Sequence, residues 1–277
     1  LCENGITDVP KPEAFDAKNG LAVYQFVRGR RLNASEIGKT QIDLAINFLR
    51  SLKQIKNSLG SRNLSNASEA VFSVTDLMEN IRYRLSRLSG ICYFGENYEK
   101  LSNFLRSEFE PALKKIESWS KSLFNPTPTW IDSQISLEQR TLSPSDFGFH
   151  NALQTDKGRL IFLDFEYFGW DDPAKMISDF LLHPALDLTA QLGSYFYSQM
   201  LEVFEEQRDL EQRIKVYYPL LGLKWCTILL NEFTQEHLAR RCFADNAASD
   251  PACQAKQIEK AKSMLEKVLS EYDLFPY

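Results

Sequence analysis

The chain has 277 residues, 44% of them apolar and 25% charged, which is typical of a globular protein with a substantial core. Its 32 Lys and Arg residues stand against 37 Asp and Glu residues, and no basic block alternates with aromatics, so a nucleic-acid partner is not expected. The cysteines are odd in number, widely spaced and without a C-x-x-C pair, which argues against a disulfide framework and a zinc site: Cys2, Cys92, Cys226, Cys242 and Cys253.

The apolar runs and the first residues of the chain bear on its location in the cell. No run is long enough to span a bilayer and no signal-peptide pattern opens the sequence, so we expect a cytoplasmic protein without a membrane partner. The first residue is Leu1 rather than Met, which predicts a fragment of a longer protein.

The first thirty residues predict β-structure. Prolines extend VPKPEAF, and after the turn signal Lys18-Asn19-Gly20 comes LAVYQFV, which Gly29 ends. Beyond Asn33 the apolar residues recur with helical period. They predict a long amphipathic helix with one face formed by Ile42, Ala45, Ile46, Leu49, Leu52 and Ile55.

The rest of the chain is predicted to be mainly helical. Helices are expected at residues 74–88 and 98–123, before NPTPTW interrupts the pattern. Short strands are expected at 140–145 and 160–165, flanking a loop with a turn at Asp156-Lys157-Gly158. Further helices are predicted at 173–182, 184–206, 209–233 and 255–272. The order is a small sheet, a connector, and a helical body with a β insert.

The β insert carries the polar residues that suggest chemistry. Asp146 and Asn151 lie five residues apart in the loop SPSDFGFHNAL, and Asp164 follows the apolar strand LIFL. A carboxylate at the rim of a buried strand must be paired or hold a cation. In an extended chain Glu166 shares a side with Asp164. Two carboxylates and a carboxamide make an all-oxygen set that suits Mg²⁺.

This pattern resembles the aminoglycoside phosphotransferase and choline kinase family, a branch of the protein-kinase-like fold. The resemblance rests on an Asp with Asn five positions later, a β-turn, a strand ending in apolar-Asp-aromatic-Glu, and Gly-Trp-x-Asp-Pro. VPKPEAF and LAVYQFVRGRRL are similar to the last small-lobe strands and the hinge, and LKWCTILLNEF is similar to the helical large lobe.

The resemblance implies an α+β fold with a mostly helical large lobe, in which the β insert carries the catalytic loop. Residues 1–29 would be a remnant of the small lobe with the hinge, and residues 30–277 the helical catalytic lobe. It also implies an ATP- and Mg²⁺-dependent phosphotransferase that moves the γ-phosphate to a hydroxyl of a small molecule, such as a sugar, amino sugar or amino alcohol. The sequence does not specify the acceptor.

The resemblance assigns a role to each polar residue. Asp146 corresponds to the catalytic-loop aspartate, while Asn151 and Asp164 would bind Mg²⁺. Glu166 is expected near the metal or the acceptor. The adenine would lie against the backbone of three hinge residues, Gln25, Phe26 and Val27.

Two Asp-Phe pairs compete for the metal-binding position. Asp146-Phe147-Gly148 spells the kinase DFG motif, but its spacing to Asn151 assigns Asp146 to the catalytic loop and leaves Asp164 as the metal-binding aspartate. Taken alone, Asp146 and Asn151 could be turn residues that bond their own backbone. The presence of Asp164 at the end of an apolar strand in the same segment favours the catalytic interpretation.

The sequence departs from the family in three respects, of which the first and the third support an alternative. Pro144 and Ser145 stand before the catalytic Asp, where the family often has a His, and Asp179, the candidate for supporting the catalytic loop, lies about one turn late. Nothing before residue 20 resembles a glycine-rich phosphate loop or a strand with an ATP-contacting Lys. The alternative is a kinase-fold binding module with impaired catalysis, or an inactive fragment of a kinase.

The remaining candidates have simpler interpretations. A hydrolase that uses Asp164 and Glu166 as its two carboxylates is disfavoured. The two residues are two positions apart on one strand, so they are not expected to flank a glycosidic bond from opposite sides. Asp172 before Pro173 is predicted to start a helix. His150 is predicted to be a hydrogen-bonded loop residue, and a histidine metal cluster is not expected in a chain with three histidines.

Overall fold

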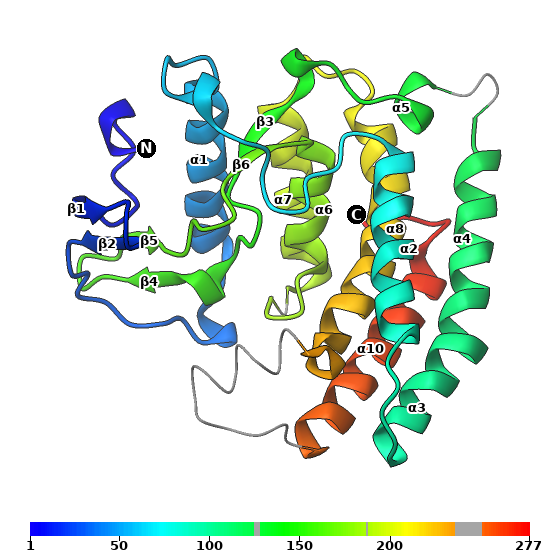
Figure 1. Ribbon diagram of the computed structural model, residues 1–277. Helices are drawn as coiled ribbons and strands as arrows, with labels where there is room; N and C mark the ends of the chain where they lie inside the picture. The colour runs from blue at the N-terminus through cyan, green and yellow to red at the C-terminus, as the bar shows by residue number, and fades with distance from the viewer. Residues whose placement is uncertain (125–127, 187, 236–250) are drawn as a thin grey trace. The chain divides into compact units, whose positions relative to one another are not determined.

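The protein, seen here in a computed structural model, is described for residues 1–124, 128–186, 188–235 and 251–277 (Figure 1). These residues divide into two compact units. The first consists of residues 1–70, 136–211 and 277, and the second of residues 71–135 and 212–276. All predicted site residues belong to the first unit. The division expected between residues 29 and 30 remains a prediction.

The first unit begins with a β-hairpin, as predicted. β1 (Pro12–Asp16) pairs antiparallel with β2 (Leu21–Tyr24), and every residue of both strands is exposed. The Asp16 carboxylate closes the turn by accepting hydrogen bonds from the backbone N–H groups of Lys18 (3.0 Å) and Asn19 (3.2 Å). The hairpin leads directly into the segment that contains residues 25–27.

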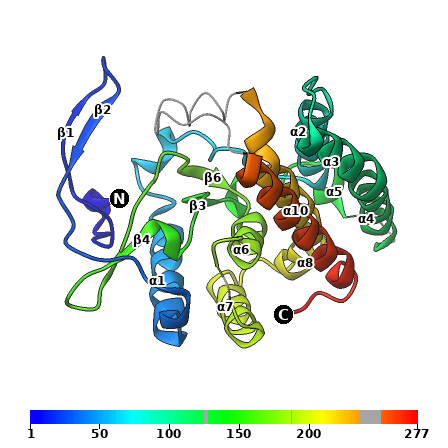
Figure 2. The same cartoon turned by 90° about the horizontal axis from the view of Figure 1, so that it is seen from below.

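The β insert forms two antiparallel pairs of short strands (Figure 2). β3 (Thr141–Ser143) pairs with β6 (Gly169–Asp171), and β4 (Ala152–Gln154) pairs with β5 (Leu160–Phe162). The expected strands at 140–145 and 160–165 were therefore too long, and β4 and β6 were missed. Three-residue strands show too little alternation to be recognised from sequence, and their partners come from other parts of the insert.

Two helices pack on the insert, and a third helix packs on both of them. α1 (Lys39–Ile55) packs against α7 (Ala190–Val203) and β3, and α6 (Pro173–Leu182) also packs against α7 and β3. The buried face of α1 contains the predicted residues apart from half-buried Ile55, together with Phe48.

The ends of α6 and α7 follow from local chemistry. The Asp172 carboxylate accepts a hydrogen bond from Ala174 N–H at 2.7 Å and Pro173 occupies the first turn, as predicted. The helix ends before His183, because Pro184 disfavours a helical backbone in the residue preceding it. The expected helix 184–206 begins only at Ala190, so its predicted start was wrong.

The second unit is helical. A single helix was expected at 98–123, but α3 (Glu96–Phe104) and α4 (Glu110–Ser122) are joined by a π-helical segment (Leu105–Phe109). The others are α2 (Val74–Ser89), α5 (Thr129–Asp132), α8 (Leu210–Leu229), a 3₁₀ segment (Leu230–Phe233) and α10 (Pro251–Glu271). Cys242 lies outside the described residues.

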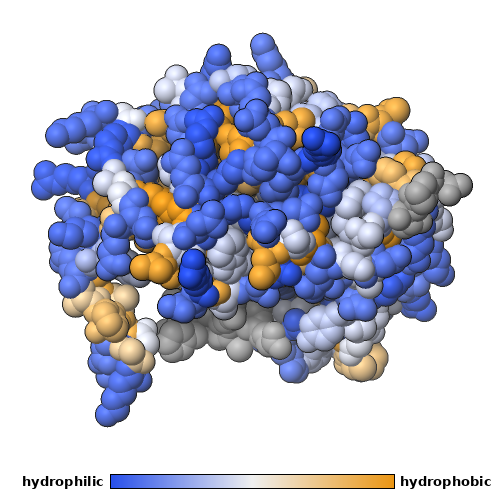
Figure 3. All heavy atoms as spheres, turned by 90° about the horizontal axis from the view of Figure 1, so that it is seen from above, coloured by the Kyte–Doolittle hydropathy of each residue, from blue (hydrophilic) through white to orange (hydrophobic). Residues whose placement is uncertain are grey.

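Hydrophilic side chains predominate on the face shown in Figure 3, and hydrophobic residues gather there in separate patches. None of the helices within the described ranges is long and apolar enough to cross a membrane.

Candidate active site

The loop between β3 and β4 carries Asp146 on a constrained backbone. Ser145 has a φ of 67°, and Asp164 after β5 has a φ of 63°; both lie in the left-handed region that L-residues rarely adopt. Ser145 is held in place because its N–H donates to Ser143 Oγ (3.1 Å) and its hydroxyl to the Ser68 carbonyl (3.2 Å). Such strained backbone persists where the surrounding contacts enforce it, often at functional sites.

The phenylalanines of the two Asp-Phe pairs anchor this backbone. Phe147 and Phe165 both pack on Phe48 of α1, with ring centroids 5.6 Å and 5.9 Å away. Phe162 of β5 completes the cluster at 4.6 Å from Phe48 and 4.8 Å from Phe147. Both pairs therefore use their aromatic ring for packing, and the motif D-F by itself does not distinguish the two aspartates.

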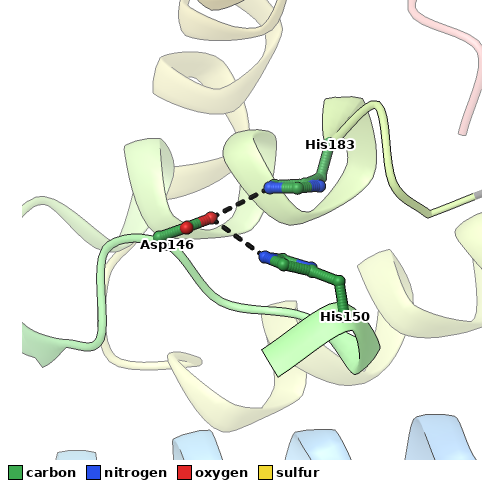
Figure 4. A group of neighbouring side chains, drawn as sticks. All are labelled: Asp146, His150 and His183. Atoms are coloured by element: carbon green, nitrogen blue, oxygen red, sulfur yellow. Dashed lines mark hydrogen bonds and ion pairs between the residues drawn. The ribbon is translucent and has the colours of Figure 1, made fainter. Parts of the chain in front are cut away.

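Asp146 is held by two histidines (Figure 4). His150 Nε2 lies 3.1 Å and His183 Nε2 lies 3.0 Å from the same carboxylate oxygen, Oδ1. The two imidazole rings stack with centroids 4.1 Å apart and planes inclined by 17°. The hydrogen bonds from His150 and His183 hold the pKa of the Asp146 carboxyl well below its usual range. We call Asp146, His150 and His183 the Asp146 cluster.

Asn151 joins Asp146 to the end of β5. Its Nδ2 donates to the Asp146 carbonyl at 3.1 Å and lies 3.4 Å from Asp146 Oδ2. Its own carbonyl accepts a hydrogen bond from the Leu163 N–H at 2.8 Å. This places Asn151 beside the residue that precedes Asp164.

The carboxylates of Asp164 and Glu166 have no hydrogen bond or ion pair with any described residue. Loss of hydration raises the pKa of the Asp164 carboxyl, and the negative charges of Glu166 and Asp146 add to this effect. The carboxylates of Asp146 and Glu166 are therefore close enough to Asp164 for their charges to act on it. A cation there would relieve their mutual repulsion.

A cavity of about 900 Å³ opens beside these carboxylates within the first unit. Its lining includes Asp164 and Glu166, together with Leu153 of β4 and Leu163. The hinge residues also line it: Gln25, Phe26 and Val27. The predicted hinge and the predicted metal-binding aspartate therefore meet at one cavity.

Asp179 lies in a different charge cluster. Lys175 Nζ is 2.8 Å from Asp171 Oδ2 and 2.9 Å from Asp179 Oδ2. Burial opposes the charge of Lys175, but the two carboxylates outweigh it and raise the pKa of its ammonium. We call Asp171, Lys175 and Asp179 the Lys175 network. Support of the catalytic loop by Asp179 remains a prediction.

The structure adds a histidine that the sequence did not indicate. His150 is a hydrogen-bonded loop residue, as predicted, and with His183 and Asp146 it forms a group whose ligand atoms lie within 4.8 Å of one another. The expectation that the chain has no histidine metal cluster stays a prediction. His183 was missed because it is 37 residues from Asp146, and the only local signal was its position before Pro184 at a helix end.

Comparisons with known proteins identify the fold. Similar solved structures include the ethanolamine kinase of Plasmodium vivax, with a TM-score of 0.59 and 15% identity over 97% of this chain and 69% of that one. The choline kinase LicA of Streptococcus pneumoniae has a TM-score of 0.54 and 17% identity over 94% and 75% of the two chains. Spectinomycin phosphotransferase APH(9)-Ia, in complex with ADP and spectinomycin, has a TM-score of 0.59 and 12% identity over 98% and 80%.

No protein-family model and no curated protein sequence matches the chain. The structural likeness shows that the chain has the α+β, protein-kinase-like fold of choline and ethanolamine kinases and of aminoglycoside phosphotransferases, as its sequence predicted.

Proposed function

We propose that the protein is a phosphotransferase that uses ATP and Mg²⁺ to phosphorylate a hydroxyl of a small molecule, such as a sugar, amino sugar or amino alcohol. The observation that carries this proposal is that the hinge and Asp164 line one cavity, while Asn151 links Asp146 to Leu163, the residue before Asp164. The fold neighbours support it, because their names describe small-molecule kinases, and two were solved in complex with AMP and ADP.

The donor set suits Mg²⁺. Asp164 offers a carboxylate that no described residue neutralises, and Asn151 offers a carboxamide whose nitrogen is already directed at Asp146. Oxygen ligands of this kind bind Mg²⁺ together with substrate phosphates. When bound, the ion would neutralise the charge of the phosphates during transfer. In this proposal Glu166 stands beside the metal or the acceptor.

The hinge is suited to a nucleotide base. The peptide groups of Phe26 and Val27 make no hydrogen bond with any other described residue, whereas Gln25 N–H already donates to the Lys11 carbonyl at 2.8 Å. Both residues line the cavity, and their peptide groups would hydrogen-bond adenine. Apolar Leu153 and Leu163 line the same cavity and would pack on the ring.

In the proposed reaction Asp146 orients the acceptor hydroxyl and accepts its proton. The hydroxyl oxygen forms a bond to the γ-phosphorus while the bond from that phosphorus to the bridging oxygen breaks, and ADP leaves with the electron pair. The hydroxyl proton passes to Asp146 and then to water. Because phosphoryl transfer needs little covalent assistance, the residues contribute mainly orientation and electrostatic stabilisation.

The test is a measurement of ADP formation with a panel of sugars, aminoglycosides and amino alcohols. We expect Asp146→Ala to lower turnover at least 100-fold while ATP affinity changes by less than about threefold. Asp164→Ala should weaken Mg·ATP binding as well. Asp156→Ala, an acidic residue of the exposed β4–β5 turn, is the matched control and should leave both quantities unchanged.

Two outcomes would count against the proposal. Equal turnover by the wild type and Asp146→Ala would remove Asp146 from the mechanism. ATP binding without turnover of any acceptor would favour the alternative, a kinase-fold binding module.

A further inference from the structure

The Asp146 cluster contains a feature that the proposed reaction does not require. The Nε2 atoms of two imidazoles lie 3.0 Å and 3.1 Å from the same oxygen of the Asp146 carboxylate, Oδ1 (Figure 4). His150 comes from the same loop as Asp146, whereas His183 comes from the end of α6. Among the described residues, Oδ2 has only the longer contact of 3.4 Å with Asn151 Nδ2. The two carboxylate oxygens therefore have different surroundings.

The backbone fixes the tautomer of His183. The N–H of Ala185 donates to His183 Nδ1 at 3.1 Å, so Nδ1 carries a lone pair. A neutral imidazole with a bare Nδ1 has its proton on Nε2. The buried ring of His183 is therefore a hydrogen-bond donor to Asp146 Oδ1.

His150 has the same tautomer for a different reason. Its Nδ1 is buried and has no hydrogen-bond partner in the part of the chain that the structure describes, and a buried N–H without an acceptor is more costly than a bare lone pair. A bare Nε2 would in addition set a lone pair against the Asp146 carboxylate at 3.1 Å. The ring fits against Gly148, where an added Cβ would come within 2.9 Å of Nδ1.

A transition-metal site is the competing interpretation of the same three residues. Their ligand atoms lie close enough together to bind one ion. Metal-binding histidines use the lone pair of one nitrogen and donate the N–H of the other to an acceptor. In His183 that arrangement would direct an Nδ1 proton at the Ala185 N–H, which is itself a donor. The hydrogen-bonding pattern therefore disfavours ligation by His183 Nε2.

We propose that His150 and His183 are positioning residues, which as neutral N–H donors occupy Oδ1 of Asp146 and leave Oδ2 as the oxygen presented to the acceptor hydroxyl. The role of Oδ2 rests on the proposed function, whereas the donor role of the histidines does not. The arrangement fixes the carboxylate plane from two independent segments of the chain.

The first test is the tautomeric state of the histidines in the full chain at neutral pH, by ¹⁵N–¹H NMR of histidine-labelled protein. We expect His150 and His183 to show a protonated Nε2 and a bare Nδ1. His237→Gln removes the signal of the third histidine, and His150→Gln and His183→Gln assign the other two. A protonated Nδ1 on either residue would overturn the proposal.

The second test is titration with Zn²⁺ alone, followed by calorimetry and by the same NMR signals. We expect no shift of the His150 and His183 resonances. Binding in the range of about 1 µM that His183→Gln abolishes would show a metal site and would overturn the donor arrangement.

The third test separates positioning from stability. His183→Phe keeps a ring but removes the donor, and we expect a loss of about 10- to 100-fold in kcat with the KM for ATP unchanged. His183→Gln keeps an N–H donor and should recover most of this loss. Unchanged kcat in His183→Phe, or no recovery in His183→Gln, would contradict the positioning role.

The two proposals fail separately. If the wild type phosphorylates no acceptor while both histidines carry Nε2 protons bonded to Asp146, the donor arrangement holds and the phosphotransferase function is wrong. If turnover depends on Asp146 but His183→Phe has no effect, the function holds and the positioning role is wrong.

Discussion

The Asp146 cluster and the Lys175 network are both built from carboxylates and basic side chains, yet their surroundings differ. In the Lys175 network the ammonium is 2% exposed and the side chain of Asp171 is 0% exposed. In the Asp146 cluster the Asp146 side chain is 38% exposed, and its partners are two imidazoles, for which we propose the neutral N–H donor form. One cluster is closed to water and the other keeps an oxygen available.

This difference distinguishes charged groups that stabilise the fold from charged groups that can bind a ligand. A buried ion pair whose charges are all engaged cannot bind a ligand without being broken, and breaking it is costly. The Asp146 cluster leaves Oδ2 without a close partner, and the neighbouring carboxylates of Asp164 and Glu166 are unneutralised among the described residues. We therefore expect the two clusters to respond in opposite ways to substitution: the Lys175 network through stability, and the Asp146 cluster through activity.

The largest expected effect is in the Lys175 network. Lys175→Met keeps most of the side-chain volume but removes the ammonium that lies between Asp171 and Asp179. Breaking a buried ion pair in this way costs about 3–5 kcal/mol, so we expect a loss of that size in the free energy of unfolding. Urea denaturation of the variant and the wild type measures it.

Lys100→Met is the matched control for this substitution. Lys100 also pairs with a carboxylate four residues away, Glu96 at 2.7 Å, but the two side chains are exposed. Exposed pairs contribute little, so the control should leave the unfolding transition nearly unchanged. A similar loss in both variants would show that burial does not distinguish the two kinds of pair.

The sequence predicted the elements of the fold better than their partners. The period of α1 and the capping of α6 by Asp172 and Pro173 are local signals, and the structure confirms both. The pairing of β3 with β6 depends on residues 26 or more positions apart in short strands, where no local pattern specifies the partner. Resemblance to a known family supplied the fold class, which the structural comparisons confirm.

The candidate site shows the same limit. The spacing of Asp146 and Asn151 and the apolar strand before Asp164 were sufficient to find these residues. The roles assigned to them remain predictions. The interaction of His183 with Asp146 could not be found, because it depends on where α6 ends in space. The ion pair between Lys175 and Asp171 was missed as well, although the two residues are four positions apart at the start of a helix, a spacing that favours such pairs.

A smaller effect is expected from Gly148→Ala, which would displace part of the Asp146 cluster. The added Cβ would lie 2.9 Å from His150 Nδ1 and 3.2 Å from Leu186 Cδ1, so the imidazole must shift from its place beside Asp146. Overpacking and the loss of one hydrogen bond should lower the free energy of unfolding by about 1–3 kcal/mol. The His150 Nε2–H resonance should change while that of His183 persists.

Gly60→Ala is the control for the glycine substitution. An added Cβ at Gly60 meets no atom within 4 Å, and its φ of −67° suits an L-residue. We expect unchanged histidine resonances and no loss of stability. An unaltered His150 signal in Gly148→Ala would show that Gly148 does not position this ring.

The smallest expected effect on stability is that of a substitution in a more exposed ion pair, Arg30–Glu36. Arg30 Nη1 donates to Glu36 Oε2 at 2.8 Å, and this guanidinium, with backbone N–H of Asn33, lowers the pKa of the Glu36 carboxyl from 4.5 to about 2. A depressed carboxyl pKa contributes stability that is present above pH 4.5 and lost as the pH falls towards 2. Because the Arg30 side chain is 57% exposed and that of Glu36 is 33% exposed, salt should screen most of this contribution. Glu36→Gln should therefore lower Tm slightly at pH 7 and low ionic strength, with the difference from the wild type vanishing at pH 2 or in 1 M NaCl. A difference that survived in 1 M NaCl would mean that the pair acts through hydrogen-bond geometry rather than through charge.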